Sequence, residues 1–296
     1  MRWWWKLLIA FVFVVIIVFL AVSVYLGYSA TKVERVAIEE SPADLGLTYQ
    51  DIEFTSQNDN LTLRGWFLPS DTSERIIIIV HGSDMHRADP NIDILGIAAE
   101  LVGHGYNVLM FDLRGHGESD GDRLSAGYHE RKDLHGAVKY AKERGFEKIG
   151  VLGFSMGAAT ALMTAAENND IDCVVSDSCF ADITDIMGRE FKSRTGFPEF
   201  FLDPVLFMVK IMYGVDFKAV RPVDSVADIS PRPILFIHGE NDDFVLPEHA
   251  KRLYQASGNN LNRLWIVPKA GHVRSYTTNP EEYIGYITSF FESALE

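Results

Sequence analysis

The chain opens with an uninterrupted apolar stretch and continues with short apolar runs separated by polar segments. Residues 7–26 contain no charged side chain. A helix of this length rises about 30 Å, which matches the hydrocarbon core of a bilayer. Arg2, Lys6 and the cluster Trp3-Trp4-Trp5 precede it, and such side chains are typical of the membrane–water boundary. The pattern predicts an N-terminal membrane anchor over residues 1–30, with one transmembrane helix.

A cleaved signal peptide is the alternative interpretation of this segment. Its apolar part is normally about 7–15 residues long and is followed by a small-residue cleavage site. Only Ala21-Val22-Ser23, inside the apolar run, resembles such a site, so we favour an uncleaved anchor. The short basic end favours a cytoplasmic N-terminus and an extracytoplasmic domain, although Lys32 and Arg35 follow the run.

Beyond a polar connector at residues 31–46, strand and helix patterns alternate. Residues 49–55 and 61–68 flank a polar turn and predict a hairpin. The β-branched run Arg75–Val80 is typical of a strand buried on both faces. Further strands are predicted at 107–111, 148–154, 171–175, 233–237 and 263–267, and helices at 91–104, 128–144, 155–167, 247–256 and 280–295. This alternation predicts an α/β fold, a mainly parallel sheet with helices on both faces.

The alternation stops between residues 185 and 230, where many large apolar side chains gather. A structureless insert of this length is unusual, so the segment predicts a helical cap. The expected organisation is an anchor at 1–30, a connector at 31–46 and one α/β domain at 47–296 that carries the cap at about 185–230.

A candidate nucleophile lies in Gly153-Phe154-Ser155-Met156-Gly157, a G-x-S-x-G pattern. The pattern alone is weak, but it ends a predicted strand and opens a predicted helix. That strand–turn–helix setting is what a nucleophile elbow requires, with glycines where side chains would clash. Ser155 is therefore the predicted nucleophile, and a glycine-rich packing turn is the alternative.

A serine hydroxyl needs a base, and the base needs an acid that orients it. His272 lies in a loop after the last predicted strand, on the carboxyl side where sites of α/β sheets form. Four other histidines lie on predicted helices and are expected to be surface groups: His104, His129, His135 and His249. Asp242, Asp243 and Glu240 all follow a predicted strand, and spacing alone does not discriminate between them. Asp242 is the predicted acid, with Asp243 as the first alternative and Glu240 as the second.

Two backbone N–H groups are candidates to bind an oxyanion. Met156 opens a predicted helix, where the helix dipole favours negative charge. The second donor is expected in the loop after the Arg75–Val80 strand, from Ser83, with Asp84 as the alternative in register.

Charge and cysteine content exclude some function classes. The formal net charge is -14, which disfavours binding to nucleic-acid phosphates. Cys173 and Cys179 are expected to be buried apolar residues, since no Cys/His cluster of metal-ligand spacing accompanies them. We expect no metal and no cofactor.

Taken together, these motifs resemble the α/β-hydrolase superfamily, and within it the bacterial serine-aminopeptidase-like and monoacylglycerol-lipase-like group. The matching pieces run from about Tyr49 to the C-terminus: His81-Gly82, the Asp112–Ser119 stretch, Gly153–Gly157, His238-Gly239 with Asp242 and Val245, and Gly271-His272. The resemblance implies an α/β-hydrolase fold with a Ser155–Asp242–His272 triad, and it selects Asp242 over Asp243. It gives the Asp112–Ser119 stretch, His116 included, a structural role at the rim of the site.

The sequence therefore predicts a membrane-anchored serine hydrolase. It would cleave a carboxylic ester or related small acyl substrate through an acyl-enzyme on Ser155. Acyl transfer or peptidase action with the same triad is one alternative. A membrane-tethered binding protein that keeps the fold without catalysis is another.

Overall fold

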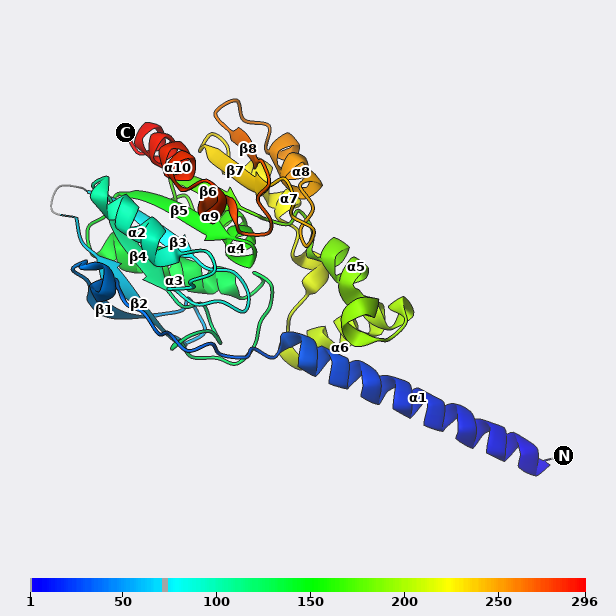
Figure 1. Ribbon diagram of the computed structural model, residues 1–296. Helices are drawn as coiled ribbons and strands as arrows, with labels where there is room; N and C mark the ends of the chain where they lie inside the picture. Colours follow the sequence, from blue (N-terminus) through cyan, green and yellow to red (C-terminus); the bar gives the residue numbers. More distant parts are fainter. Residues whose placement is uncertain (1, 71–73) are drawn as a thin grey trace.

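The computed structural model describes residues 2–70 and 74–296 (Figure 1). Its centre is an eight-stranded sheet in the order β1-β2-β4-β3-β5-β6-β7-β8. The strands are β1 (Gln50–Thr55), β2 (Thr62–Leu68), β3 (Arg75–Val80), β4 (Asn107–Phe111), β5 (Lys148–Phe154), β6 (Cys173–Asp177), β7 (Ile234–Gly239) and β8 (Arg263–Val267). The β1–β2 hairpin pairs antiparallel and joins β4 antiparallel, whereas β4 to β8 are parallel. The predicted mainly parallel sheet is confirmed.

Helices cover both faces of the sheet because the central strands are apolar on both sides. On β3, Ile76, Ile78 and Val80 pack on one face and Ile77 and Ile79 on the other. The first face is covered by α3 (Glu130–Glu143), α4 (Met156–Glu167) and α8 (Glu248–Ser257). The second is covered by α2 (Ile94–Gly103), the short α9 (Ser275–Thr278) and α10 (Pro280–Ala294).

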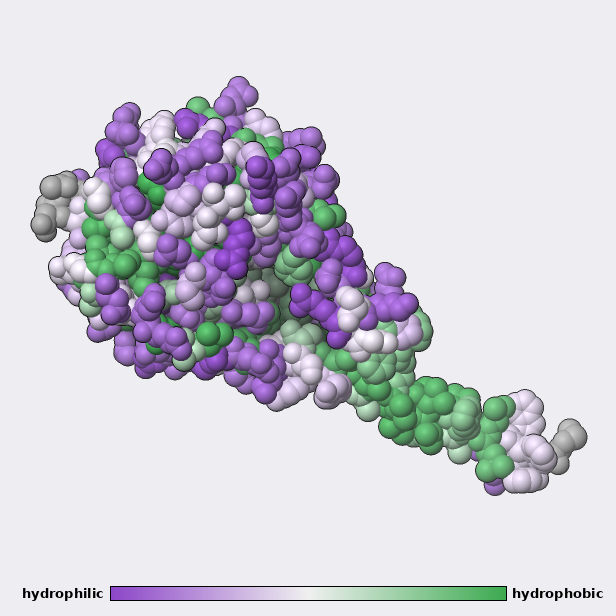
Figure 2. Space-filling view, in the orientation of Figure 1, coloured by the Kyte–Doolittle hydropathy of each residue, from purple (hydrophilic) through white to green (hydrophobic). Residues whose placement is uncertain are grey.

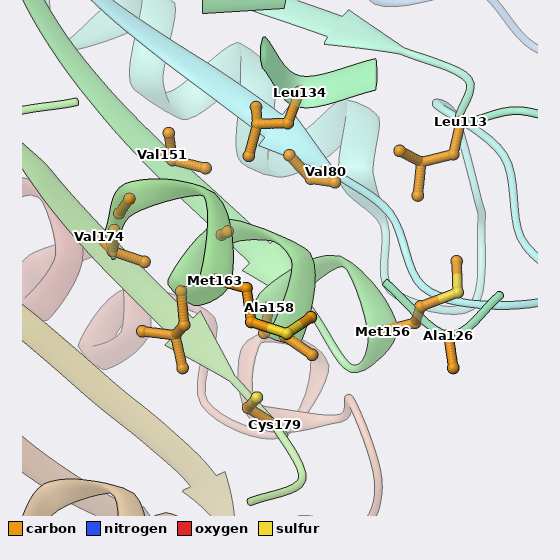
Figure 3. Packing of buried hydrophobic residues seen from close by; sticks show 14 of the residues in the cluster. Val80, Leu113, Ala126, Leu134, Val151, Met156, Ala158, Met163, Val174 and Cys179 are labelled. Carbon is orange, nitrogen blue, oxygen red and sulfur yellow. The ribbon is translucent and has the colours of Figure 1, made fainter. Parts of the chain in front are cut away.

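The alanine-rich helix α4 packs closely on the sheet. Figure 3 shows Ala158 and Met163 of this helix in one packed cluster with Val151 and Val174 of the paired strands β5 and β6. Small side chains let the helix axis approach the strands, which brings the first residue of α4 close to the end of β5. The helix start is thus held in place by the core beneath it.

Between β6 and β7 the chain leaves the sheet and forms the cap. The cap consists of α5 (Ile183–Thr195), η2 (Glu199–Phe201), α6 (Leu202–Tyr213), η3 (Phe217–Ala219), α7 (Pro222–Ser225) and η4 (Val226–Ile229). These helices lie at one end of the sheet, and α6 lies beside the N-terminal helix α1 (Arg2–Thr31) (Figure 1). The helical insert expected at about 185–230 therefore has defined structure, while the domain limits stay predictions.

Among the described residues, α1 alone is long and apolar enough to cross a membrane. It protrudes from the body (Figure 1), with residues 3–18 exposed and several later residues buried, Leu26 among them. A short 3-10 helix, η1 (Pro42–Leu45), lies in the connector that leads from α1 to the sheet. Length and composition fit either a membrane span or a signal sequence.

Candidate active site

Ser155 occupies a strained turn between β5 and α4. Its backbone has φ 51° and ψ -114°, a conformation that costs a non-glycine residue about 1–3 kcal/mol. The turn is possible because two glycines remove side chains from the crossing. A Cβ on Gly153 would lie 2.7 Å from the Cα of Ala158, and one on Gly157 would overlap the carbonyl oxygens of Val80 and His81. Helix and strand therefore meet at backbone distance, which the glycine pattern predicts.

The structure brings Ser155, His272 and Asp242 together from three separate strand ends. The Oγ of Ser155 lies 3.0 Å from Nε2 of His272. The other ring nitrogen of His272, Nδ1, lies 2.7 Å from Oδ2 of Asp242. The three predicted side chains thus form one continuous hydrogen-bonded line.

Asp242 is buried and surrounded by donors. Its Oδ1 accepts the backbone N–H groups of Phe244 and Val245, at 3.1 and 2.8 Å. Burial raises the pKa of this carboxyl, but hydrogen bonds from His238 and His272 outweigh it and lower the pKa to about 2. Asp242 is therefore ionised at neutral pH.

The ionised carboxylate determines the tautomer of His272. A carboxylate oxygen only accepts, so the Nδ1 that faces Asp242 carries the proton. In the neutral ring, Nε2 is then the acceptor that faces the Ser155 hydroxyl. The arrangement lets His272 take the proton of Ser155 while Asp242 stabilises the resulting imidazolium.

His238 is a second histidine at Asp242, and its contact was not predicted. Its Nε2 lies 3.2 Å from Oδ2 of Asp242 and 2.6 Å from the carbonyl oxygen of Val245. Because a carbonyl only accepts, Nε2 carries the proton and donates. The His238-Gly239 pair is part of the family resemblance, but the order of residues along the chain does not predict that the His238 ring contacts Asp242.

The loop after β3 passes beside Ser155 at Gly82, the residue before Ser83. A Cβ on Gly82 would lie 3.3 Å from the Cβ of Ser155. Buried His81 accepts the N–H of Leu113 at Nε2, 3.0 Å away, so its Nδ1 donates to the carbonyl of Gly82 at 2.7 Å. The peptide plane is rigid, so the Ser83 N–H points opposite to that carbonyl.

The two predicted oxyanion donors have no hydrogen-bond acceptor within the described part of the protein. Across residues 2–70 and 74–296, neither the Ser83 N–H nor the Met156 N–H donates to a protein acceptor. Met156 is the first residue of α4, whose leading N–H groups lack partners within the helix. Asp84, the alternative in register, follows in the same loop with φ 58°.

A buried hydroxyl chain holds the loop that carries His272. The N–H of Val273 donates to Oγ of Ser178 at 3.1 Å, and that hydroxyl donates to Oδ1 of Asp177 at 2.9 Å. Ser275 donates to the same Oδ1 at 3.2 Å. Ser178 and Val273 both have positive φ, 56° and 51°, so the backbone is strained on both sides of this contact.

The cap reaches the site through Phe244. The ring of Phe244 meets the His272 ring edge-on at 5.1 Å between centroids. From α5, Arg189 donates to the Phe244 carbonyl, and the Arg194 guanidinium lies 5.2 Å from the Phe244 ring centroid. Figure 2 shows the surface hollowed where the cap meets the body.

The remaining candidate acids and histidines lie elsewhere. Asp243 and Glu240 are exposed, and Glu240 accepts the N–H of Lys269 at 3.1 Å.

One prediction was wrong: His249 is buried on α8, not a surface group, and its Nδ1 accepts the Ala181 N–H at 3.1 Å. This hydrogen bond links His249 on α8 to the chain just before the cap, and helical spacing in the sequence does not reveal such a contact. His116 is also buried, beneath the loop and 5.1 Å from the His81 ring centroid.

The Asp112–Ser119 stretch is held by a buried ion pair. Asp112 accepts the backbone N–H of Arg87 at 2.8 Å and pairs with its guanidinium, which also contacts Glu118 at 2.5 Å. The guanidinium lies 4.1 Å from the ring centroid of Trp66. Such contacts fix the shape of this loop.

Fold and geometry together define an α/β hydrolase. The profile described as "Alpha/beta hydrolase family" matches residues 77–285, so the chain belongs to that family. It is similar to the esterase Pf2001 of Pyrococcus furiosus, with 30% identity, a TM-score of 0.75, and coverage of 89% of this chain and 100% of that one. This likeness supports hydrolase activity.

Two relatives extend the comparison. "Uncharacterized protein YqkD" of Bacillus subtilis (strain 168) is 29% identical over 236 residues, which cover 78% of this chain and 75% of the relative. "Uncharacterized membrane protein YNL320W" of Saccharomyces cerevisiae is 22% identical over 242 residues, 79% of this chain and 76% of the relative. Relatives in bacteria and yeast thus match most of the chain.

Proposed function

We propose that the protein is a membrane-anchored serine hydrolase that cleaves a carboxylic ester through an acyl-enzyme on Ser155. The observation that carries this proposal is the unbroken line Ser155 Oγ–His272 Nε2, 3.0 Å, and His272 Nδ1–Asp242, 2.7 Å. The esterase likeness at 30% identity supports the ester as the substrate class.

In the first half of the reaction, Oγ of Ser155 bonds to the ester carbonyl carbon while its proton passes to Nε2 of His272. The carbonyl π electrons move onto oxygen, and the N–H groups of Ser83 and Met156 bind that oxyanion. The C–O bond to the alcohol then breaks, and the imidazolium returns its proton to the leaving oxygen. Asp242 stays ionised throughout and stabilises the charged ring.

In the second half, water replaces the alcohol. His272 takes a proton from water as its oxygen bonds to the acyl carbon, and the same N–H groups bind the second oxyanion. The Ser155–acyl bond then breaks, the proton returns to Oγ, and the acid leaves.

The proposed anchor is α1. Its exposed apolar residues lie along the helix from Leu7 to Leu20, preceded by three exposed tryptophans. An apolar helix flanked by tryptophans is stable when lipid covers it, and exposure to water on every face would be costly. The basic N-terminal end favours a cytoplasmic N-terminus and an extracytoplasmic hydrolase domain.

The test is a Ser155→Ala variant of the full chain, purified in detergent. We expect unchanged circular dichroism, no labelling by a fluorophosphonate probe and no hydrolysis of p-nitrophenyl acetate. Ser193→Ala, an exposed serine on α5, is the matched control and should label like the wild type. Full activity of Ser155→Ala would end the assignment of the nucleophile.

A further inference from the structure

The second half of α1 packs against the cap. Phe19 contacts Phe200 and Phe201, with ring centroids 6.3 and 4.5 Å apart. Two turns farther on, Gly27 approaches α6 so closely that a Cβ would lie 2.9 Å from Cγ2 of Val209. Leu26 is buried in the same contact and belongs to the hydrophobic core. Helix and cap thus form one packed unit.

The end of α1 is also fastened to the body. The Arg123 guanidinium lies over the rings of Tyr28 and Tyr213, at 4.4 and 4.5 Å, and donates to the Tyr28 carbonyl at 3.0 Å. Just beyond the helix, Arg35 donates to the carbonyl of Gly117 at 2.7 Å. The direction of α1 relative to the domain is therefore set by contacts on both sides of the join.

The length of α1 that stands clear of the cap is too short to cross a bilayer alone. Cap contacts begin at Phe19, so the free apolar part is residues 7–18, or about 18 Å of helix. A hydrocarbon core is about 30 Å thick. The missing length is the segment from Phe19 to Leu26, about 12 Å, which lies against the cap. If α1 spans the bilayer, the adjoining part of the cap is inside it.

The cap surface beside this segment is apolar. Phe200, Phe207 and Ile211 are 66%, 61% and 63% exposed. Phe207 and Ile211 lie four residues apart on one face of α6, and Phe200 lies in η2, directly before that helix. Figure 2 shows the hydrophobic surface of α1 continuing onto the neighbouring part of the cap. Exposed aromatic and branched residues that gather in this way mark an interaction site.

Two charged residues share the exposed face of α6, and both are paired. Asp203 lies 2.6 Å from Lys218, and Lys210 lies 2.5 Å from Asp216. Paired charges beside apolar side chains are the composition of a helix that lies in the membrane interface, where its apolar face enters about 5–10 Å. This depth is of the same order as the length that α1 lacks.

On this basis, and resting on the proposed anchor and ester hydrolysis, we propose that the cap is embedded in the same bilayer that α1 spans. Phe200, Phe207 and Ile211 enter the acyl region, and the site draws its substrate, a membrane-resident ester with a long acyl chain, from that leaflet. Arg189 of the cap donates a hydrogen bond to the Phe244 carbonyl, and the Phe244 ring packs on His272. A substrate that enters under the cap therefore arrives beside the nucleophile.

The test places a fluorescent NBD label on the full chain in phosphatidylcholine vesicles. Single cysteines are introduced by Phe207→Cys in the cap, Val14→Cys in α1 and Leu261→Cys in a loop far from both; Leu261 is 60% exposed. The native cysteines, Cys173 and Cys179, are buried and provide the unlabelled background. Quenching by nitroxide lipid and by aqueous iodide is measured for each label.

We expect lipid nitroxide to quench the labels at 207 and 14, and iodide to quench the label at 261 at least threefold more than that at 207. If lipid nitroxide quenches the label at position 14 while the label at position 207 behaves like that at 261, the proposal of an embedded cap is wrong and the proposed anchor stands. If lipid nitroxide quenches neither the label at 14 nor that at 207, the proposed anchor is wrong as well. Protection of 207 from both quenchers means that protein, such as a second copy, covers this face, which also overturns the proposal.

A kinetic measurement separates the cap from the triad. The double variant Phe207→Asp/Ile211→Asp should lower, about tenfold, the ratio of long-chain vesicle ester hydrolysis to p-nitrophenyl acetate hydrolysis. Leu261→Asp should keep the wild-type ratio. An unchanged ratio in the double variant would count against membrane delivery of substrate, whereas loss of both activities in Ser155→Ala tests only the nucleophile.

Discussion

The hydroxyl of Ser178 accepts a 3.1 Å hydrogen bond from the backbone N–H of Val273, the residue that follows His272. Ser178 lies directly after β6, so this bond ties the histidine loop to the centre of the sheet. Both residues have positive φ, and the bond holds two strained backbone positions against each other. The position of the base is therefore determined by the neighbouring strand as well as by its own loop.

Ser178→Ala removes this support. We expect kcat for p-nitrophenyl acetate to fall about tenfold with little change in KM, because a small displacement of a catalytic group slows the chemical step more than binding. Loss of the buried acceptor should also cost about 1–3 kcal/mol of stability. Steady-state kinetics and thermal unfolding check both, with Ser193→Ala as the control. Wild-type kcat in Ser178→Ala would show that the bond does not position His272.

Asp177 should make stability fall as pH rises. Burial, only partly offset by the Ser178 hydrogen bond, raises the pKa of Asp177 from 3.8 to about 6. The folded state therefore holds this proton more tightly than the unfolded state, and the group costs stability as pH rises from about 4 through 6, by up to about 3 kcal/mol.

Asp177→Asn removes that titration. Relative to the wild type, its unfolding temperature should rise between pH 4.5 and pH 7.5, as followed by tryptophan fluorescence in detergent. The comparison between the two proteins cancels the titration of the other groups. If the curves of unfolding temperature against pH run parallel for the two proteins over this range, the pKa of Asp177 is not raised in the folded state.

Asp242 should change the pH dependence of stability in the opposite direction to Asp177. Its pKa of about 2 lies below the ordinary 3.8, so its ionised form stabilises the fold above about pH 4, and this contribution is lost as pH falls towards 2. Asp242→Asn should be less stable by up to about 2 kcal/mol at pH 7, and the gap should narrow below about pH 4 and close as the pH falls through 2.

The same substitution separates the candidate acids. We expect Asp242→Asn to lower kcat by about 10³–10⁴-fold, because the amide favours the wrong tautomer of His272. Asp243→Asn, at the exposed neighbour, should keep nearly full activity. Initial rates with p-nitrophenyl acetate measure both, and the reverse order would transfer the role to Asp243.

Gly157 should tolerate no side chain. A methyl group there would overlap the carbonyl oxygens of Val80 and His81, which are backbone atoms of the central sheet and cannot move aside. Gly157→Ala should therefore cost about 3 kcal/mol or more and displace Ser155. Gly188→Ala, in open space within α5, should instead stabilise by about 0.5–1 kcal/mol. Equal unfolding temperatures for the two variants would contradict the crossing geometry.

The sequence by itself determined the features that depend on local pattern and chain order. The predicted strands at 75–80, 148–154 and 263–267 have the same limits in the structure, because β-branched and apolar runs bounded by polar segments are local signals. The glycines around Ser155 predicted a backbone crossing, because only glycine fits one. The strand predicted at 171–175 instead covers Cys173–Asp177, so Asp177 was not recognised as its final residue.

Only the tertiary structure decided which distant groups meet. Spacing did not separate Asp242, Asp243 and Glu240, and the family pattern favoured Asp242; the folded chain shows the contact itself, with Oδ2 of Asp242 2.7 Å from Nδ1 of His272. The Ser178–Val273 bond spans 95 residues, and the Phe19–Phe201 contact joins the N-terminal helix to the cap. Such contacts follow from sheet order and helix packing, where long-range burial outweighs local preference, and no periodicity along the chain encodes them.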